Sequence, residues 1–350
     1  MKIIGCDFHP SHQQIAMLDE STGELSGRRL SHPGEAQEFY RSLRGPVRVG
    51  MEAVGNALWF ERLLTKLGHE WWVGDAARIR AAAVRQQKTD TRDAALVLEL
   101  MLQGRFPRIW VPSPAERDLR QLLLHRHKLV EMRTQVKNQL QHLALNQGVR
   151  RQHRLWSAAG RTVLESLDLP GWTARRRKDL LALLDMLEQS VAELDRAVEA
   201  EAQARPDCRA LMTEPGVGPV VSLATVLTLG PVERFQRGKQ VASYLGLTPR
   251  EHSSGGRQRL GRISKQGNSF LRVLLVQAAH VAVQHDDELG RQYRRLAQRK
   301  NRGVAIVAIA RKLAVRLYWI LRRKAWESGK VGSMQGSPSH SVAEALKPSA

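Results

Sequence analysis

Two stretches in the middle of the chain carry apolar residues at heptad spacing, and this pattern constrains the fold most strongly. From Leu180 to Val198, apolar residues follow one another at alternating intervals of four and three. In the preceding stretch four apolar residues recur every seven positions: Leu122, Leu129, Val136 and Leu143. Such spacing places one apolar stripe along a helix. It predicts two long, coiled-coil-like helices, which can pair within one chain or between protomers, and it favours a homo-oligomer, a dimer or a tetramer.

The residues before these helices predict a mixed α/β domain. Apolar runs bounded by turn residues predict strands at four places: residues 2–6, 14–18, 47–51 and 71–73. The turn residues Ser21–Gly23 predict that the first strands follow one another as a meander. Helical spacing predicts helices over residues 57–67 and over residues 76–104, where neither glycine nor proline interrupts the run between its ends.

The whole chain is predicted to be α/β plus all-α. A polar, arginine-rich connection at residues 150–177 joins the long helices, and a mainly helical domain follows, ending in a basic helix at residues 303–324. The last residues are rich in serine, proline, glycine and alanine, a composition that predicts a disordered tail. The predicted domains are residues 1–112, 113–205, 206–330 and 331–350.

The charge of the chain is strongly basic and unevenly distributed. Lys and Arg number 55 against 34 Asp and Glu, a net charge of +21. Residues 1–112 hold 15 basic and 13 acidic side chains, and residues 113–350 hold 40 and 21. A nearly neutral domain followed by a basic one predicts a polyanionic partner, and nucleic acid is the first candidate.

Other classes of protein are disfavoured. The two cysteines, Cys6 and Cys208, are far apart and have no neighbouring Cys/His pair, so they predict neither a disulfide framework nor a zinc ribbon. We interpret both as small buried hydrophobic residues. The N-terminus lacks the features of a signal peptide, and no apolar run is long and uncharged enough to span a membrane. We therefore expect a cytoplasmic, nucleoid-associated protein.

Four acids form the first candidate site: Asp7, Glu52, Asp90 and Asp93. The first two follow predicted strands, and the other two are three residues apart, which on a helix puts both carboxylates on one face. Mg²⁺ prefers hard oxygen ligands, so this set suits metal-assisted attack on a phosphodiester. Each acid taken alone is more often an ordinary solvated side chain. Asp75, which also follows a strand, is the substitute if Glu52 or Asp90 is misassigned.

The basic part of the chain holds two further candidates. Gly216 and Gly218 lie in a turn between predicted helices, where backbone N–H groups can approach a phosphate as in a helix-hairpin-helix motif, although a plain turn would use the same glycines. Ser254 lies in a glycine-rich loop with basic residues that could bind a nucleic-acid backbone: Arg257, Arg262, Lys265 and Arg272. The loop could also bind DNA without any nucleophilic role for its serine.

Taken together these motifs resemble a known family, the bacterial insertion-sequence transposases that join an N-terminal RuvC-like DEDD nuclease domain to a C-terminal serine-bearing transposase domain. The matching stretches occur in family order: residues 5–7, 51–53, 88–94, 215–219, 244–249, 254–256, 265–268 and 271–272. They span about residues 3–325. Any one of these stretches is a weak signal, whereas the ordered set is specific.

The resemblance implies an RNase H-like first domain in which the four acids bind Mg²⁺. It also implies that Ser254 attacks a DNA phosphodiester at an element end or target and holds the strand as a phosphoserine. Some members resemble RNA-guided recombinases, so a structured guide RNA is an expected partner. Because Ser253 adjoins Ser254, a shift of one residue would move the nucleophile, and we prefer Ser254 because it precedes Gly255.

Two other functions stay open at this point. In the first, the chain is a junction-cutting nuclease in which metal-activated water attacks and the serine loop only binds nucleic acid. In the second, the chain is a non-catalytic nucleic-acid-binding remnant of a decayed element. The presence of all four acids and the serine argues against decay.

Overall fold

The computed structural model describes residues 1–83, 89–150, 154–252, 259–327 and 329. The chain divides into two compact units, Met1–Val111 and Pro112–Ala350. The predicted tail, residues 331–350, lies outside the described residues. Within the described part of the chain, no helix has both the length and the apolar character needed to cross a membrane.

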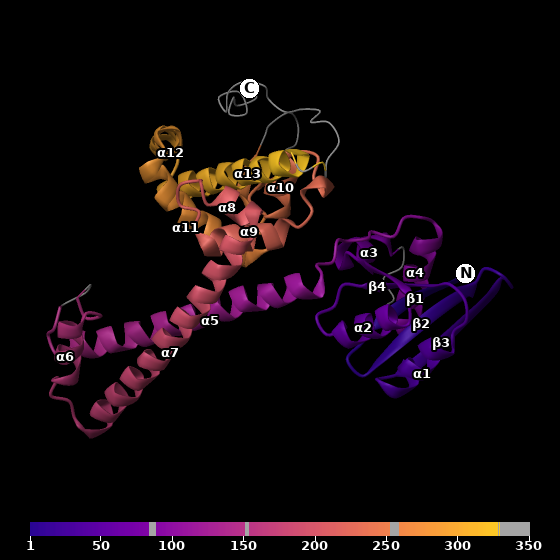
Figure 1. The fold of residues 1–350 in the computed structure, drawn as a ribbon, viewed down its shortest axis with the longest axis horizontal. Coiled ribbons are helices and arrows are strands. Elements are labelled where there is room, and N and C mark those ends of the chain that lie inside the picture. Colours follow the sequence, from indigo (N-terminus) through magenta and orange to yellow (C-terminus); the bar gives the residue numbers. More distant parts are fainter. Residues whose placement is uncertain (84–88, 151–153, 253–258, 328, 330–350) are drawn as a thin grey trace. The chain divides into compact units, whose positions relative to one another are not determined.

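The first unit is built on a five-stranded mixed sheet (Figure 1). The strands are β1 (Lys2–Phe8), β2 (His12–Asp19), β3 (Glu24–Ser31), β4 (Val47–Glu52) and β5 (Glu70–Gly74). Their order is β3-β2-β1-β4-β5, with β1, β2 and β3 as an antiparallel meander and β4 and β5 parallel to β1. The four predicted strands and the meander are therefore confirmed.

Helices lie on both faces of this sheet. They are α1 (Gly34–Ser42), α2 (Leu58–Lys66), α3 (Ala76–Ala82) and α4 (Asp90–Leu102). Successive side chains of a strand point to opposite faces, so β1 contributes to two cores. Ile4 and Cys6 belong to the core that contains Phe60 of α2, and Ile3 belongs to the core that contains Leu98 of α4.

The single helix predicted over residues 76–104 is wrong, because the structure has two helices there. α3 ends at Ala82, and Ala83 is extended with ψ 119°. Thr89 is also extended, and its hydroxyl accepts from the N–H of Arg92 as the N-cap of α4. A capping threonine starts a new helix without any glycine or proline, so a search for helix-breaking residues did not detect the boundary.

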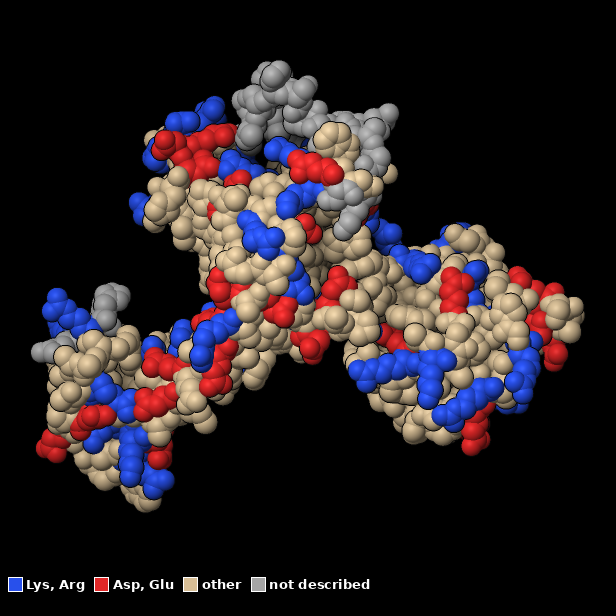
Figure 2. Space-filling model, viewed as in Figure 1, with Lys and Arg blue, Asp and Glu red and all other residues tan. Residues whose placement is uncertain are grey.

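The long helices of the second unit are α5 (Pro114–Asn146) and α7 (Gly171–Ala204), and they pack against each other within one chain (Figure 1). Val136 and Leu140 of α5 share a core with Leu184 and Leu187 of α7. On the visible face, basic and acidic side chains alternate along the pair (Figure 2). The intrachain pairing is thus found, while a coiled coil and an oligomer stay predictions.

Residues 150–177, expected to be a polar connection, also contain regular structure, and that expectation is wrong in part. α6 (Ala158–Glu165) follows an N-cap at Ser157, and α7 begins at Gly171. Among the charged residues of this segment are two buried leucines, Leu155 and Leu164, which pack into the core of the helical pair. These two side chains give the segment a hydrophobic anchor.

The rest of the second unit is a mainly helical assembly with one short hairpin. Its elements are α8 (Pro206–Leu211), α9 (Pro219–Leu229), a 3-10 turn η1 (Val232–Arg234), α10 (Gly238–Tyr244), β6 (Pro249–Glu251), β7 (Leu260–Ile263), α11 (Ser269–His285), α12 (Asp287–Arg299) and α13 (Arg302–Glu327). The predicted basic helix over residues 303–324 is confirmed as α13. The hydrophobic core of this helical assembly also contains Leu123 of α5 and Val198 of α7. Both long helices are therefore packed into this core.

Both cysteines are buried and free, as the sequence predicted. Cys6 lies in the core between the sheet and α2, and Cys208 lies in the helical core of the second unit. They therefore belong to the two different units of the chain.

Candidate active site

Asp7 and Glu52 lie side by side near the carboxyl ends of two neighbouring parallel strands. β1 and β4 pair with Gly5 opposite Gly50 and Cys6 opposite Met51, which brings Asp7 next to Glu52. Cys6 and Met51 are buried in the core on the α2 side. Because side chains alternate between faces, the two carboxylates lie on the other face, where α4 packs.

α4 lies directly on this face because the strand residues beneath it are glycines. A Cβ on Gly5 would come within 2.3 Å of the Ala94 carbonyl oxygen and 2.4 Å of the Leu98 nitrogen. This close approach brings the first turn of α4, with Asp90 and Asp93, to the strand ends that carry Asp7 and Glu52. All four predicted acids therefore gather on one edge of the sheet.

The electrostatics of Asp7 show that Asp90 and Asp93 lie near it. Burial raises the pKa of its carboxyl group, and the negative charges of Asp93 and Asp90 raise it further, while the neighbouring His9 acts in the opposite direction. Like charges brought together in a partly desolvated place favour a bound cation. Their hard oxygen donors fit the coordination that Mg²⁺ and similar ions prefer. The residues present thus fit a divalent cation.

Two histidines that the sequence analysis did not single out also belong to this edge. His9 Nε2 lies 3.1 Å from Asp7 Oδ2 and 3.6 Å from Asp90 Oδ1, and His12 Nε2 lies 3.3 Å from Asp90 Oδ2. The hydrogen bond from His12 lowers the pKa of Asp90. The spacing His9-Pro10-Ser11-His12 directly after Asp7 was the available signal, since a turn between antiparallel strands brings its two ends together.

Asp75, the substitute acid, has another role. Its carboxylate caps α3 by accepting hydrogen bonds from the N–H groups of Ala77 and Arg78, at 2.9 and 3.1 Å. Its Oδ1 atom is thereby engaged with the helix N-terminus, and the structure gives no reason to exchange it for Glu52 or Asp90.

The loop that carries the predicted serine leaves from a tight base in the second unit. Ser253, Ser254 and Arg257 lie outside the described residues, but both arms of the hairpin, β6 and β7, are described. Two turns close its base, with Gly246 at φ 65° and Gly267 at φ 73°. A Cβ on Gly267 would lie 2.0 Å from the Tyr244 carbonyl oxygen. The glycines are needed because main chain packs on main chain.

The predicted nucleic-acid-binding residues near this loop have different environments. Arg262 is exposed on β7. Lys265 has a positive φ of 57° and donates its N–H to the Gly246 carbonyl at 3.2 Å. Arg272 Nη1 donates to the carbonyls of Leu245 and Gln266, at 2.9 and 3.0 Å. Arg272 therefore ties the two turns together, whatever else it binds.

Gly216 and Gly218 lie in the predicted turn between helices α8 and α9, and they differ in their surroundings. Gly216 has φ 81°, and a Cβ there would lie 2.3 Å from the Ala278 carbonyl oxygen of α11. Gly218 is exposed, is the N-cap of α9 and has open space where a Cβ would be. Packing accounts for the first glycine, whereas only the second is open to an approaching phosphate. The helix-hairpin-helix motif stays a prediction.

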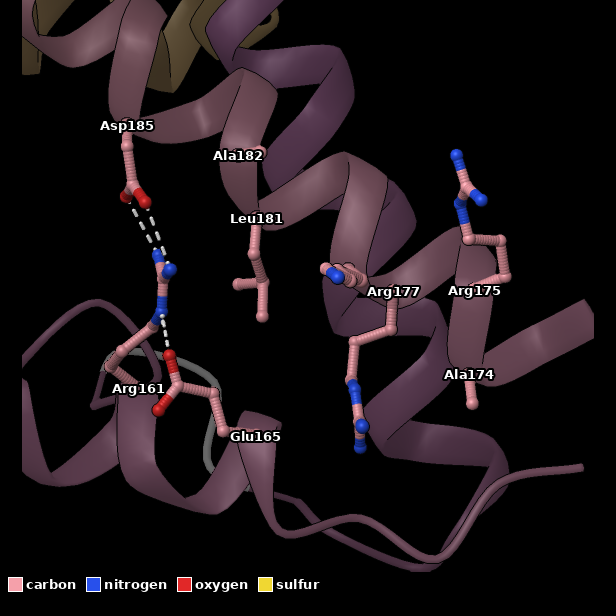
Figure 3. A pocket seen from close by; sticks show the side chains of 9 residues that line it. Arg161, Glu165, Ala174, Arg175, Arg177, Leu181, Ala182 and Asp185 are labelled. Carbon is pink, nitrogen blue, oxygen red and sulfur yellow. Dashed lines mark hydrogen bonds and ion pairs between the residues drawn. The ribbon is translucent and has the colours of Figure 1, made fainter. Parts of the chain in front are cut away.

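A hollow at the end of the helical pair, lined by charged and apolar side chains, contains none of the predicted site residues (Figure 3). Arg161 of α6 donates two hydrogen bonds to Asp185 of α7, at 2.7 and 2.9 Å, and one to Glu165, at 2.6 Å. Arg177 donates to the main-chain carbonyls of Leu164 and Leu167. These contacts hold α6 onto α7, and we assign the hollow a structural role.

Comparisons with known proteins match two successive parts of this chain to transposase families. A transposase model of the DEDD, IS110 type matches residues 4–147, and the model of the transposase IS116/IS110/IS902 family matches residues 208–294. A probable family 20 transposase of Pseudomonas aeruginosa is 31% identical, over 91% of this chain and 96% of that protein. The transposase for insertion sequence element IS1111A of Coxiella burnetii is 28% identical, over 93% of this chain and 90% of that protein.

Proposed function

The chain belongs to the IS116/IS110/IS902 family of transposases, enzymes that act on DNA, and we propose that it cuts and rejoins the strands of an insertion sequence with a Mg²⁺-binding carboxylate site and a serine nucleophile. The observation that carries the proposal is the gathering of four carboxylates on one sheet edge: Asp7, Glu52, Asp90 and Asp93. The strand order, with β2 antiparallel to its neighbours, supports an RNase H-like fold for this unit.

The four carboxylates would hold Mg²⁺, which supplies positive charge to stabilise the developing charge on a phosphate under attack. Asp7 and Glu52 are held by the sheet register, and Asp90 and Asp93 are held by the contact of α4 with Gly5. Since both supports are main-chain contacts, they fix the backbone positions from which the four side chains extend before DNA binds. Such preorganisation lets the ligands act without rearranging during the reaction.

The serine step follows from the proposed role of Ser254. Its Oγ forms a bond to phosphorus while the bond from phosphorus to the neighbouring sugar oxygen breaks, and the hydroxyl proton ends on that leaving oxygen. The product is a phosphoserine that retains the energy of the phosphodiester for rejoining. The turns at Gly246 and Gly267, tied by Arg272, give the loop that carries this serine a fixed base.

The partners in this proposal are DNA at the element ends and target, a structured guide RNA, and further copies of the chain. The excess of 40 basic over 21 acidic residues in residues 113–350 supports binding to a polyanion. Arg262, exposed on β7, and Gly218, exposed at the N-terminus of α9, are two of the described residues that a phosphate can reach.

The test is a search for protein-linked DNA on a denaturing gel, with the gene expressed between its native flanks and Mg²⁺ supplied. We expect an adduct in the wild type, its loss in Ser254→Ala, and its loss in Asp7→Asn. Loss in Ser253→Ala alone would move the nucleophile by one residue. Glu99→Gln is the matched control for the acids, because Glu99 is an exposed residue of α4 away from the site.

Cleavage that survives both serine substitutions without any adduct would overturn the serine step and favour a nuclease that uses activated water. A second readout separates metal binding from catalysis. Mg²⁺ should raise the melting temperature of the wild type and of Glu99→Gln, and it should do so less in Asp7→Asn. RNA recovered with the purified protein, sequenced and compared with the flanks, tests the guide RNA.

A further inference from the structure

We call the place where Asp7, Glu52, Asp90 and Asp93 gather the carboxylate edge. His9 and His12 form a cluster there, and the proposed Mg²⁺ site does not use these two histidines. The two imidazole rings stack with their centroids 4.7 Å apart and their planes 19° from parallel. His9 Nε2 lies 3.6 Å from Asp90 Oδ1, and His12 Nε2 lies 3.3 Å from Asp90 Oδ2. One ligand atom from each of these three residues lies within 4.8 Å of the others.

The separations differ from those of a tight ion pair. Charge-assisted hydrogen bonds between nitrogen and carboxylate oxygen are about 2.7–2.9 Å long. The distances to Asp90, 3.3 and 3.6 Å, are longer. A tetrahedral ion with ligands at about 2.0–2.1 Å holds neighbouring ligand atoms about 3.3 Å apart. Each of the two distances to Asp90 therefore also fits a pair of ligand atoms around one such ion, with either oxygen of Asp90 as the ligand.

The scaffold around the cluster holds these ligands in place. The turn between β1 and β2 is closed by the N–H of His9, which donates to the His12 carbonyl at 2.9 Å. Asp90 stands at the start of α4, next to the cap residue Thr89. His12 is 16% exposed, whereas Asp90 is 46% exposed. An ion on the cluster could thus be reached from solvent and could keep water or substrate in its open positions.

The donor set also selects the kind of ion. Mg²⁺ takes oxygen ligands and binds imidazole poorly, whereas Zn²⁺ and Co²⁺ accept two imidazoles and one carboxylate readily. We propose that His9, His12 and Asp90 form a second metal site, for a single transition-metal ion of the Zn²⁺ class, which shares Asp90 with the carboxylate set. Asp7 Oδ2 lies 3.1 Å from the same nitrogen, His9 Nε2, so binding of the ion would replace the hydrogen bond that this nitrogen makes with Asp7.

A consequence follows, and it rests on the proposed function of the carboxylate edge. Asp90 is common to both sets, so an ion on the histidines competes for one ligand of the Mg²⁺ site. Zn²⁺ at low concentration then inhibits Mg²⁺-supported strand cleavage, because His9 and His12 bind it where it takes Asp90 from the Mg²⁺ site.

The experiment is a titration of the full chain with Co²⁺ in excess Mg²⁺, followed by visible absorption, because tetrahedral Co²⁺ absorbs strongly there. We expect one Co²⁺ per chain, displaced by Zn²⁺. His12→Gln should weaken binding by more than about 100-fold, beyond the loss expected for an outer hydrogen-bond partner. His142→Ala is the control, since His142 is an exposed histidine of α5.

Two outcomes would overturn the proposal. One is a wild type that binds no Co²⁺ in excess Mg²⁺. The other is a Co²⁺ signal that persists in both His12→Gln and His9→Gln but disappears in Glu52→Gln, which would place the ion on the carboxylates. Melting curves confirm that each variant is folded. A chain that binds Co²⁺ through the histidines but never cuts DNA would refute the proposed function and leave the metal site standing.

For the inhibitory consequence, the ratio of cleavage with and without Zn²⁺ is compared within each variant. We expect Zn²⁺ to inhibit the wild type and His142→Ala, and to inhibit His12→Gln less. Equal inhibition of all three would show that Zn²⁺ acts elsewhere and would overturn the shared role of Asp90.

Discussion

The carboxylate edge of the first unit and the hairpin base of the second unit both depend on glycine, in different ways. At the edge, Gly5 lies on a paired strand, and a helix rests on it. At the hairpin base, Gly246 and Gly267 have left-handed backbones, and two turns rest on each other. The contact at Gly5 positions the side chains of Asp90 and Asp93 by holding α4 in place. The contacts at Gly246 and Gly267 position the main chain at the base of the β6–β7 hairpin.

This difference predicts what a larger residue at each glycine does to stability and to function. A larger residue at Gly5 displaces α4, and with it Asp90 and Asp93, so function suffers together with stability. A larger residue at Gly267 strains the backbone and also separates the turns, so it should cost more free energy of unfolding. Four sets of substitutions, taken from the largest expected effect to the smallest, test the comparison.

Gly267→Ala should lower the free energy of unfolding by about 3 kcal/mol. A left-handed backbone costs a residue with a Cβ about 1–2 kcal/mol, and a Cβ 2.0 Å from the Tyr244 carbonyl oxygen forces the turns apart. Urea unfolding measures the change, and hydrogen exchange should localise it to α10 and α11. Gly261→Ala on β7 is the control, because its nearest atom would be 3.7 Å away. Equal losses in the two variants would contradict the argument.

Gly5→Ala should cost about 2 kcal/mol, within the range for overpacking a well-packed site, and it should also reduce DNA cleavage. Gly50→Ala is the matched comparison on the neighbouring strand. Its Cβ would meet Met101 Sδ at 2.2 Å, and this is a flexible side chain that can turn away. We expect about 1 kcal/mol or less for Gly50→Ala in urea unfolding. A larger loss for Gly50→Ala than for Gly5→Ala would show that main-chain contact with α4 is not what limits the edge.

Arg316→Met removes a cation that joins three elements of the second unit. Arg316 Nη1 donates to Glu214 at 3.0 Å and to Asp286 at 2.6 Å. Burial alone would raise the pKa of Asp286, but the hydrogen bond and charge of Arg316, with main-chain N–H groups, hold that pKa below its ordinary value. We expect a loss of about 1–2 kcal/mol at neutral pH.

The sign of the pH dependence follows from that lowered pKa. The contribution of Asp286 is complete above the pKa it has in the unfolded chain, about 3.9, and is lost as pH falls through the lower value of the folded state. Urea unfolding at neutral pH and at about pH 3 should show the wild type and Arg316→Met converging in acid. A difference that stays constant with pH would argue against the ion pair.

The smallest effects are expected at two helix caps, one from each region. Asn268 Oδ1 accepts from the Leu271 N–H at 3.0 Å and starts α11, whereas Thr89 Oγ1 accepts from the Arg92 N–H at 3.4 Å and starts α4. We expect about 1 kcal/mol for Asn268→Ala and about 0.5 kcal/mol for Thr89→Ala. Hydrogen exchange in the first turn of each helix measures both. A larger effect for Thr89→Ala would reverse the order that these bond lengths predict.

Local patterns in the sequence were enough for the regular elements. Apolar runs bounded by turn residues predicted β1, β2, β4 and β5, and heptad spacing predicted the long helices. A second heptad series in α5 runs through Leu119, Arg126, Arg133 and Leu140. Its Arg126 pairs with Asp195 of α7. A charged residue in a seam is satisfied by a partner from the other helix, and a single-sequence pattern does not show that partner.

One of the missed features is a local cap, and the other two depend on contacts between distant residues. The boundary before α4 follows from the extended backbone at Ala83 and Thr89 in a run with no helix breaker. The buried leucines of residues 150–177 are few among many charges. His12 lies 78 positions before Asp90 in the chain, and the two meet because α4 rests on β1.

The sequence by itself determined the chemistry available to this protein. It supplies four acids in a fixed order, a serine loop rich in glycine and arginine, and a strong excess of positive charge after residue 112. Side-chain type and local periodicity are properties of neighbouring residues, so they can be recognised without coordinates.

Tertiary structure alone decided which of these groups meet. The parallel register of β1 and β4 sets Asp7 beside Glu52, and the missing side chain of Gly5 lets α4 bring Asp90 and Asp93 to them. The same contact places Asp90 against His9 and His12. These are distances between segments far apart in the chain, fixed by close packing of main chain on main chain, and residue spacing in the sequence does not encode them.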